Sequence, residues 1–107
     1  MPNARDVLFR TLADPTLRAL FERLCREGEQ TVGALTARAR ISQPAVSKHL
    51  GVLKQAGLVR DRHEGRRTHY SAQLSALAPL IDWTGQMAGF WGRRFDHLED
   101  LLKRMDQ

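Results

Sequence analysis

Apolar residues recur at the spacing of an amphipathic helix through the first half of the chain. The segments that carry this pattern begin and end with residues suited to helix termini. Asp14 before Pro15 is a favourable N-cap, Gly28 is a favourable stop, and Thr31 and Ser42 are favourable N-caps. The pattern predicts four helices, at residues 3–13, 15–27, 31–39 and 42–57.

The fourth predicted helix has one buried face and one open face. Val46, Leu50 and Leu53 fall at positions i, i+4 and i+7, which predicts a stripe directed at the core. A helix-turn-helix presents the start of its second helix to the major groove of DNA. The third and fourth helices therefore predict DNA recognition by a compact polar face made of Ser42, Gln43, Pro44, Ser47 and Lys48.

Two short strand-like runs follow, Leu58–His63 and Arg66–Ala72, with Glu64-Gly65 as the predicted turn between them. Leu58 is expected to point to the core. A helix-turn-helix followed by a basic hairpin is typical of a winged helix. The expected fold is therefore mainly α with a small β-hairpin wing.

The positive charge of the chain is concentrated on these same elements. The net charge is +5, but the segment from Arg38 to Tyr70 alone carries +6, and the remaining residues carry −1. Binding to a polyanionic partner explains such a distribution better than a general contribution to solubility does. The partner expected here is double-stranded DNA. The eight basic residues of the segment are Arg38, Arg40, Lys48, Lys54, Arg60, Arg62, Arg66 and Arg67.

The last third of the chain predicts one long helix, at about residues 75–105, with Ser75 as its N-cap and Pro79 in its first turn. Its apolar residues step alternately by four and three positions, which is the period of a coiled coil. This stripe is wider than a small chain can cover, so we expect a homodimer through the first and last helices. The alternative is a helix folded back over the chain's own core. The expected interface residues are Leu8, Leu12, Trp83, Met87, Trp91, Phe95, Leu98 and Leu102.

Length and composition restrict the function further. A chain of 107 residues is expected to form one domain, residues 1–107. It has no apolar run long enough to cross a membrane and no signal-like start, so a cytoplasmic protein is expected. No paired carboxylates flank a glycine-rich loop, and no Ser-His-Asp arrangement or phosphate-cradling loop is present, so we expect no enzymatic activity.

The sequence resembles the ArsR-type family of winged-helix repressors over roughly residues 6–73. The resemblance is carried by residues 12–16, 41–50 and 53–59. It implies a homodimer that binds a palindromic operator and represses its own operon. It also implies that Ser42, Gln43 and Ser47, with Pro44 beside them, approach the bases. We expect contacts to the DNA backbone from Lys48, Lys54, Arg62, Arg66, Arg67 and Tyr70.

The sequence departs from the metal-sensing members of that family. The stretch Thr31–Leu35 lacks their paired cysteines, and Cys25 stands alone, so no metal and no cofactor are expected. Asp96, His97 and Asp100 form only a thin candidate metal site on the long helix. The tail resembles a branch that lacks metal sites, which leaves an organic effector or none. A winged helix used for protein–protein contact is the remaining alternative.

Overall fold

The computed structural model describes residues 3–106. The chain divides into two compact units at the junction between Leu77 and Ala78, and each unit is described by itself. The expectation of a single domain stays a prediction.

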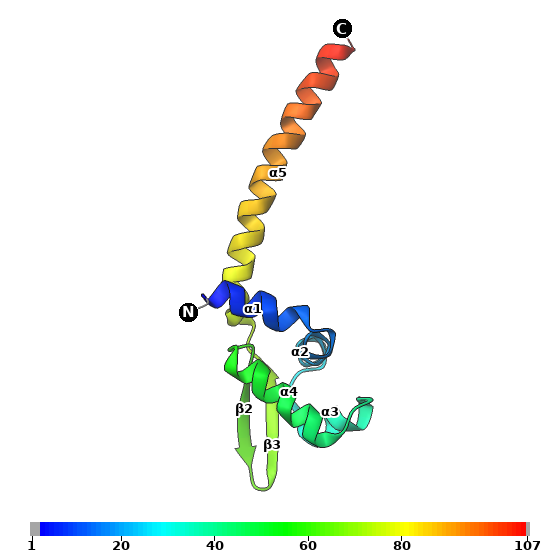
Figure 1. Cartoon of the computed structure of the whole chain (residues 1–107), viewed down its shortest axis with the longest axis vertical. Helices are drawn as coiled ribbons and strands as arrows, with labels where there is room; N and C mark the ends of the chain where they lie inside the picture. Colours follow the sequence, from blue (N-terminus) through cyan, green and yellow to red (C-terminus); the bar gives the residue numbers. More distant parts are fainter. Residues whose placement is uncertain (1–2, 107) are drawn as a thin grey trace. The chain divides into compact units, whose positions relative to one another are not determined.

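The first unit contains the four helices that the sequence predicts: α1 (Ala4–Ala13), α2 (Pro15–Glu27), α3 (Val32–Arg38) and α4 (Gln43–Gln55) (Figure 1). The predicted N-caps are confirmed. A carboxylate oxygen of Asp14 accepts hydrogen bonds from the backbone N–H groups of residues 16 and 17. In the same way, the Thr31 hydroxyl accepts a hydrogen bond from the N–H of residue 34, and the Ser42 hydroxyl accepts one from the N–H of residue 45. Gly28 ends α2 with a φ of 81°, a conformation that suits glycine.

Helix α4 ends slightly earlier than predicted, at Gln55, because the chain closes it with a paired C-cap. The backbone N–H of Leu58 bonds to the carbonyl of Leu53 at 3.0 Å, and that of Gly57 bonds to the carbonyl of Lys54 at 3.0 Å. Gly57 takes the left-handed conformation that this arrangement requires, with a φ of 81°.

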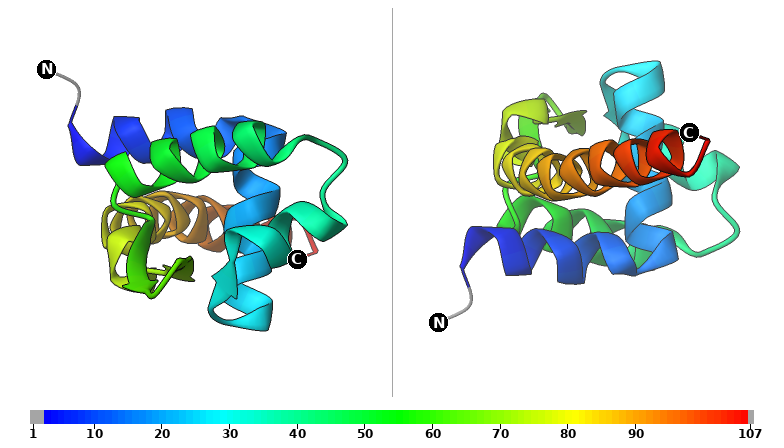
Figure 2. Two further views of the ribbon diagram at one scale, coloured as in Figure 1. Left: turned by 90° about the horizontal axis from the view of Figure 1, so that it is seen from below. Right: turned by 90° about the horizontal axis from the view of Figure 1, so that it is seen from above.

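The core lies where the buried stripes of these helices meet. The predicted stripe of α4 is confirmed, since Val46, Leu50 and Leu53 are all 0% exposed, and so is the inward direction of Leu58. Helix α2 packs against α1, α4 and β3, and Figure 2 shows it crossing α4 rather than running alongside it. The other buried apolar residues of the unit are Leu8, Leu17, Leu20, Phe21, Leu24, Leu35 and Val59.

The sheet has three strands rather than the predicted two: β1 (Gln30–Thr31), β2 (Val59–Glu64) and β3 (Arg67–Ala72). Their order is β1-β3-β2, and both pairings are antiparallel. Strand β1 was missed because two residues are too few to show an alternating pattern. The predicted turn was also shifted by one residue: Glu64 belongs to β2, so Gly65 and Arg66 form the turn, with Gly65 at a φ of 61°.

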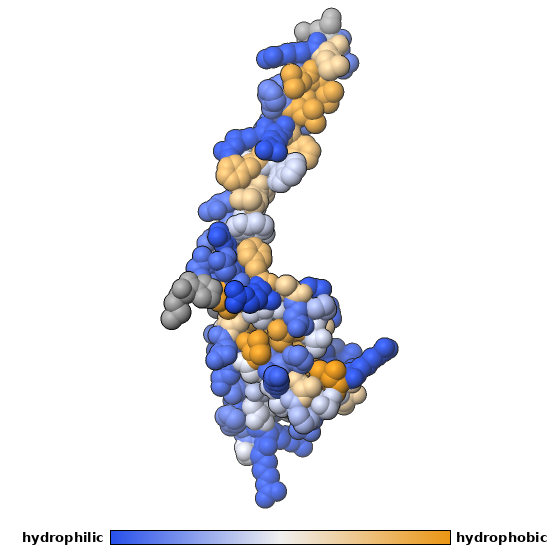
Figure 3. All heavy atoms as spheres, in the orientation of Figure 1, coloured by the Kyte–Doolittle hydropathy of each residue, from blue (hydrophilic) through white to orange (hydrophobic). Residues whose placement is uncertain are grey.

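The second unit is the helix α5 (Ala78–Met105), preceded in the chain by a short 3-10 helix at Leu74–Leu77. The predicted N-cap was wrong, because Ser75 lies within the 3-10 helix. Pro79 does lie in the first turn of α5, where a missing N–H group costs no hydrogen bond. No helix in residues 3–106 is long and apolar enough to cross a membrane. Apolar side chains occupy the surface of α5 along much of its length (Figure 3).

Candidate nucleic-acid interface

The first turn of α4 presents small polar side chains to solvent. Ser42, Gln43, Pro44 and Ser47 are all exposed. The hydroxyl oxygen of Ser42 accepts a hydrogen bond from the backbone N–H of Ala45, with 3.3 Å between the two atoms. The hydroxyl can still donate its proton to a partner. Gln43 and Ser47 lie four residues apart on one side of the helix, where both can reach the same ligand.

A polar groove of about 540 Å³ separates this face from the tip of the hairpin. Gln43 and Ser47 line one side, and Arg66, Arg67 and Thr68 line the other. Residues 31–33, at the start of α3, complete the wall. Guanidinium groups facing amide and hydroxyl groups across a polar groove suit a ligand that carries both negative charge and hydrogen-bonding edges.

The basic residues of the predicted interface fall into two groups. Lys48, Arg66 and Arg67 are exposed, and no carboxylate of the described residues forms an ion pair with them. Lys54 instead binds Asp61, with Nζ 3.0 Å from Oδ2, and this hydrogen bond holds the pKa of the Asp61 carboxyl below its usual range. The charges of the first group, Lys48, Arg66 and Arg67, therefore remain available to a polyanion, whereas Lys54 belongs to a second group whose charges are paired within the chain.

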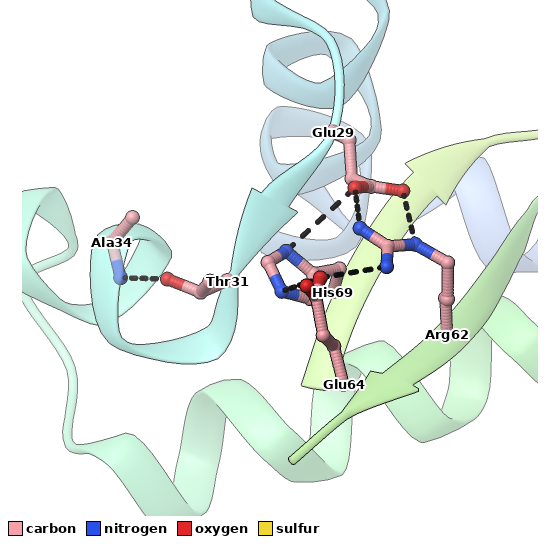
Figure 4. Close-up of polar contacts among 6 residues, drawn as sticks. All are labelled: Glu29, Thr31, Ala34, Arg62, Glu64 and His69. Atoms are coloured by element: carbon pink, nitrogen blue, oxygen red, sulfur yellow. Dashed lines mark hydrogen bonds and ion pairs between the residues drawn. The ribbon is translucent and has the colours of Figure 1, made fainter. Parts of the chain in front are cut away.

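Arg62 belongs to the second group and is held by two carboxylates. Its Nη2 lies 2.6 Å from Oε1 of Glu29, and its Nη1 lies 2.8 Å from Oε2 of Glu64 (Figure 4). These hydrogen bonds hold the pKa of both carboxyls below their usual range and raise the pKa of Arg62. Nothing in the sequence around Arg62 indicates Glu29 as a partner.

One further residue of the predicted set is partly covered. Tyr70 is half-buried on β3, opposite Asp61 of β2, so it shares a sheet face with the partner of Lys54. His49, which is not in that set, is also half-buried, between the exposed Lys48 and the buried Leu50 of α4.

The predicted dimer residues differ in how much surface they offer. Leu8 is 2% exposed within a single chain, so it belongs to the core of the chain and presents almost nothing to a partner. Leu12, Trp83 and Met87 are half-buried. Of the predicted α5 residues, those that are exposed in a single chain are Trp91, Phe95, Leu98 and Leu102.

The aromatic residues of α5 also interact with neighbouring arginines, which the sequence reading did not identify. Arg93 lies over the ring of Phe90 at 4.8 Å, and Arg94 lies over the ring of Trp91 at 5.7 Å. The rings of Trp91 and Phe95 are 6.1 Å apart between centroids. These contacts orient the aromatic side chains on the helix surface.

Within residues 3–106, no group of three or more His, Cys, Asp and Glu side chains is close enough together to hold a metal ion. Cys25 is exposed, and partial desolvation together with the charge of Glu22 raises the pKa of its thiol. A raised pKa lowers the fraction of reactive thiolate.

Glu27 joins the two helices that position α4. It binds Arg23 of its own helix at 3.1 Å and Arg38 of α3 at 2.6 Å, while Arg23 also donates to the carbonyls of Ala34 and Leu35. The hydrogen bonds from Arg38 and Arg23 hold the pKa of Glu27 below its ordinary value of 4.5. The folded state is therefore stabilised above that value, and the stabilisation is lost as the pH falls through the lowered pKa.

Replacing Glu27 with glutamine is expected to lower the urea midpoint of unfolding at pH 7 by a small amount. The difference from the original protein should shrink as the pH falls below 4.5 and through the lowered pKa of Glu27, because the original side chain then becomes neutral as well. Urea titrations at pH 7, 5 and 3.5 measure this. The matched control is Glu22→Gln, whose arginine contacts are both 3.9 Å long. A difference as large at pH 3.5 as at pH 7 would contradict a charge-based role for Glu27.

Comparison with known proteins identifies the family. A family described as a helix-turn-helix domain matches residues 12–62. An HTH-type transcriptional regulator of Mycobacterium tuberculosis is 43% identical over 79% of this chain and 83% of its own length. The transcriptional repressor SdpR of Bacillus subtilis is 34% identical over 71% of this chain and 83% of its own length. A crystal structure of an ArsR family transcriptional regulator superposes with a TM-score of 0.76 at 28% identity, covering 86% of this chain and 94% of the other.

The chain belongs to the ArsR-type family of winged helix-turn-helix repressors. This ArsR-type protein is a DNA-binding transcriptional repressor, and its helices and three-stranded sheet are those of the family's winged helix. An ArsR-like regulator from Rhodococcus superposes with a TM-score of 0.73 at 26% identity over 92% of both chains. The family and fold confirm the predicted mainly α winged helix-turn-helix.

Proposed function

We propose that this ArsR-type repressor acts as a homodimer that binds a palindromic operator upstream of its own gene. The observation that carries the proposal is the polar groove between α4 and the wing, the hairpin formed by residues 59–72. In this proposal, Gln43 and Ser47 read base edges in the major groove, with Ser42 and Pro44 beside them. A glutamine amide matches the donor and acceptor pair of adenine, and a serine hydroxyl serves several bases.

Lys48, Arg66 and Arg67 bind DNA phosphates in this proposal, because their charges are not neutralised within the chain. Lys54 and Tyr70 are assigned secondary contacts to the DNA backbone in this proposal. The exposed stripe of α5, comprising Trp91, Phe95, Leu98 and Leu102, supplies the dimer contact. With a two-fold axis, two copies of α4 would meet half-sites about one helical turn of DNA apart.

The proposal includes neither catalysis nor a metal effector, and it assigns the protein to the cytoplasm because its proposed DNA partner lies there. The test is fluorescence anisotropy with labelled DNA from upstream of the protein's own gene, at about 0.15 M salt, a physiological ionic strength. Tight binding to one palindrome that is unchanged by Zn²⁺ is expected. Release by Zn²⁺ would instead indicate a metal site, with Asp96, His97 and Asp100 as the first residues to examine. No specific binding would favour a protein-interaction role.

Replacing Gln43 with alanine is expected to remove discrimination at one base step by about 1–3 kcal/mol while leaving non-specific binding unchanged. The measurement compares the variant and the original protein on the operator and on single-base variants of it. The matched control is Gln55→Ala, at the far end of the same helix. An equal loss of affinity for all sequences would exclude base reading by Gln43.

A further inference from the structure

Four charged or polar side chains contact one another: Glu29, just before β1, and Arg62, Glu64 and His69 of the wing, here called the wing clamp (Figure 4). Arg62 lies at its centre, between the two carboxylates. We infer that the wing clamp fixes the wing to the body of the first unit, and that Arg62 is a positioning residue rather than a phosphate ligand. The DNA-binding part of this inference rests on the proposed function.

The clamp spans all three strands of the sheet. Arg62 of β2 lies opposite His69 of β3, which in turn lies opposite Thr31 of β1. Glu29 immediately precedes β1, which is the edge strand on the other side of β3 from β2. The Arg62 side chain of β2 therefore reaches past β3 toward the β1 edge of the sheet. The contact joins residues 33 positions apart in the chain. Because β1 pairs with β3 at only two positions, this side-chain contact is a further link between the wing and the segment that leads into β1.

The geometry uses the fork shape of the guanidinium. Arg62 donates Nε and Nη2 to the two oxygens of Glu29, at 3.4 and 2.6 Å, and Nη1 to Glu64 at 2.8 Å. His69 lies between the same carboxylates, with Nδ1 3.6 Å from Glu29 and Nε2 3.6 Å from Glu64. Isolated ion pairs on a protein surface contribute little, but an arginine that contacts a carboxylate at two points, or a network of several charges, can hold its side chains in place.

The charge balance of the clamp disfavours a phosphate at Arg62. Two carboxylates surround one guanidinium, so these three groups together carry a charge of −1. The hydrogen bonds from Arg62 keep the pKa of Glu29 and Glu64 low, so both carboxyls stay ionised at neutral pH. A phosphate would have to approach this negative pair, whereas Arg66 and Arg67 at the tip have no such neighbours in ion-pair contact among the described residues. A wing that is already fixed also loses less conformational entropy when it meets DNA.

The test compares three variants, Arg62→Lys, Arg62→Gln and Glu29→Gln, in the full chain. A lysine keeps the positive charge that a phosphate would need but lacks the fork that holds two carboxylates. All three variants are expected to bind the operator about threefold to tenfold more weakly, with the dependence on salt concentration unchanged. Amide hydrogen exchange in the free protein should become faster in residues 59–72 and stay unchanged in α2. The control is Glu22→Gln, which removes the same charge as Glu29→Gln on an exposed part of α2.

Three results would overturn the inference. One is full affinity in Arg62→Lys together with a salt slope about one unit smaller in Arg62→Gln, which is the signature of a phosphate contact. Another is tighter binding by Glu29→Gln than by Glu22→Gln, since Glu29 would then merely compete for Arg62. The third is unchanged hydrogen exchange of the wing in Arg62→Gln. If the original protein bound no DNA, the proposed function would fail, while the exchange measurement would still decide whether the clamp holds the wing.

Discussion

Replacing Trp91 with aspartate is expected to convert the proposed dimer into monomers and to abolish tight operator binding. The Trp91 side chain is exposed in a single chain and lies within the stripe of α5, so an aspartate there would place a charge in the proposed interface. Loss of a central aromatic residue costs an interface about 2–4 kcal/mol, and burying an unpaired carboxylate adds to that. The association constant should therefore fall at least about thirtyfold.

Sedimentation at several protein concentrations measures this effect, with circular dichroism as the check on folding. The matched control is Gln86→Asp, which puts the same charge about 140° away around the same helix. Because Trp91 is 58% exposed and lies outside the buried core, the variant should stay folded. If the variant did unfold, Leu98→Asp on the same stripe would repeat the test. A dimer of undiminished stability would place the interface away from the α5 stripe.

Replacing Arg66 and Arg67 together with glutamine is expected to weaken binding to every DNA sequence. Each arginine should neutralise one phosphate, so the slope of log affinity against log salt concentration should decrease by about two units. Charge-assisted hydrogen bonds of this kind are worth about 1.5–3 kcal/mol, so the affinity should fall about tenfold or more for each residue. Discrimination between operator variants should remain, because phosphate contacts carry no base information.

Anisotropy titrations between 0.05 and 0.3 M salt, spanning the range over which such contacts weaken, measure both quantities. The control is the double variant Arg18→Gln and Arg26→Gln, which removes the same charge from α2, outside the groove. A slope that changed equally in the two double variants would mean that overall charge, and not the wing tip, governs binding. A slope that changed in neither would remove Arg66 and Arg67 from the set of phosphate contacts.

The structural environment changes the interpretation of residues that look alike in the sequence. Arg62, Arg66 and Arg67 are one cluster in the printed chain, yet Arg62 is bound by two carboxylates while Arg66 and Arg67 line the groove. Lys54 is likewise engaged, by Asp61. The number of basic residues in this segment therefore overstates the charge that it can offer to DNA.

Local chemistry determined much of this protein from the sequence alone. The starts of α2, α3 and α4 follow from a capping side chain and the N–H groups two or three residues later, and the stripe of α4 follows from apolar spacing. These features depend on residues within one helical turn of each other, so they could be predicted correctly. The family resemblance rested on the same short segments.

Only the tertiary structure decided the contacts between distant segments. Strand β1 exists because Gln30 and Thr31 find partners in β3, forty and thirty-eight positions away in the register of the sheet. Leu8, predicted at the dimer interface, is buried within the chain, because helix periodicity identifies an apolar face but not what covers it. Glu64 is two residues from Arg62 on the same strand, but Glu29 becomes its partner only because the fold brings the segment before β1 close to β2. An ion pair depends on the distance between its two charges in space. For residues more than about one helical turn apart in the sequence, that distance cannot be inferred from their spacing along the chain.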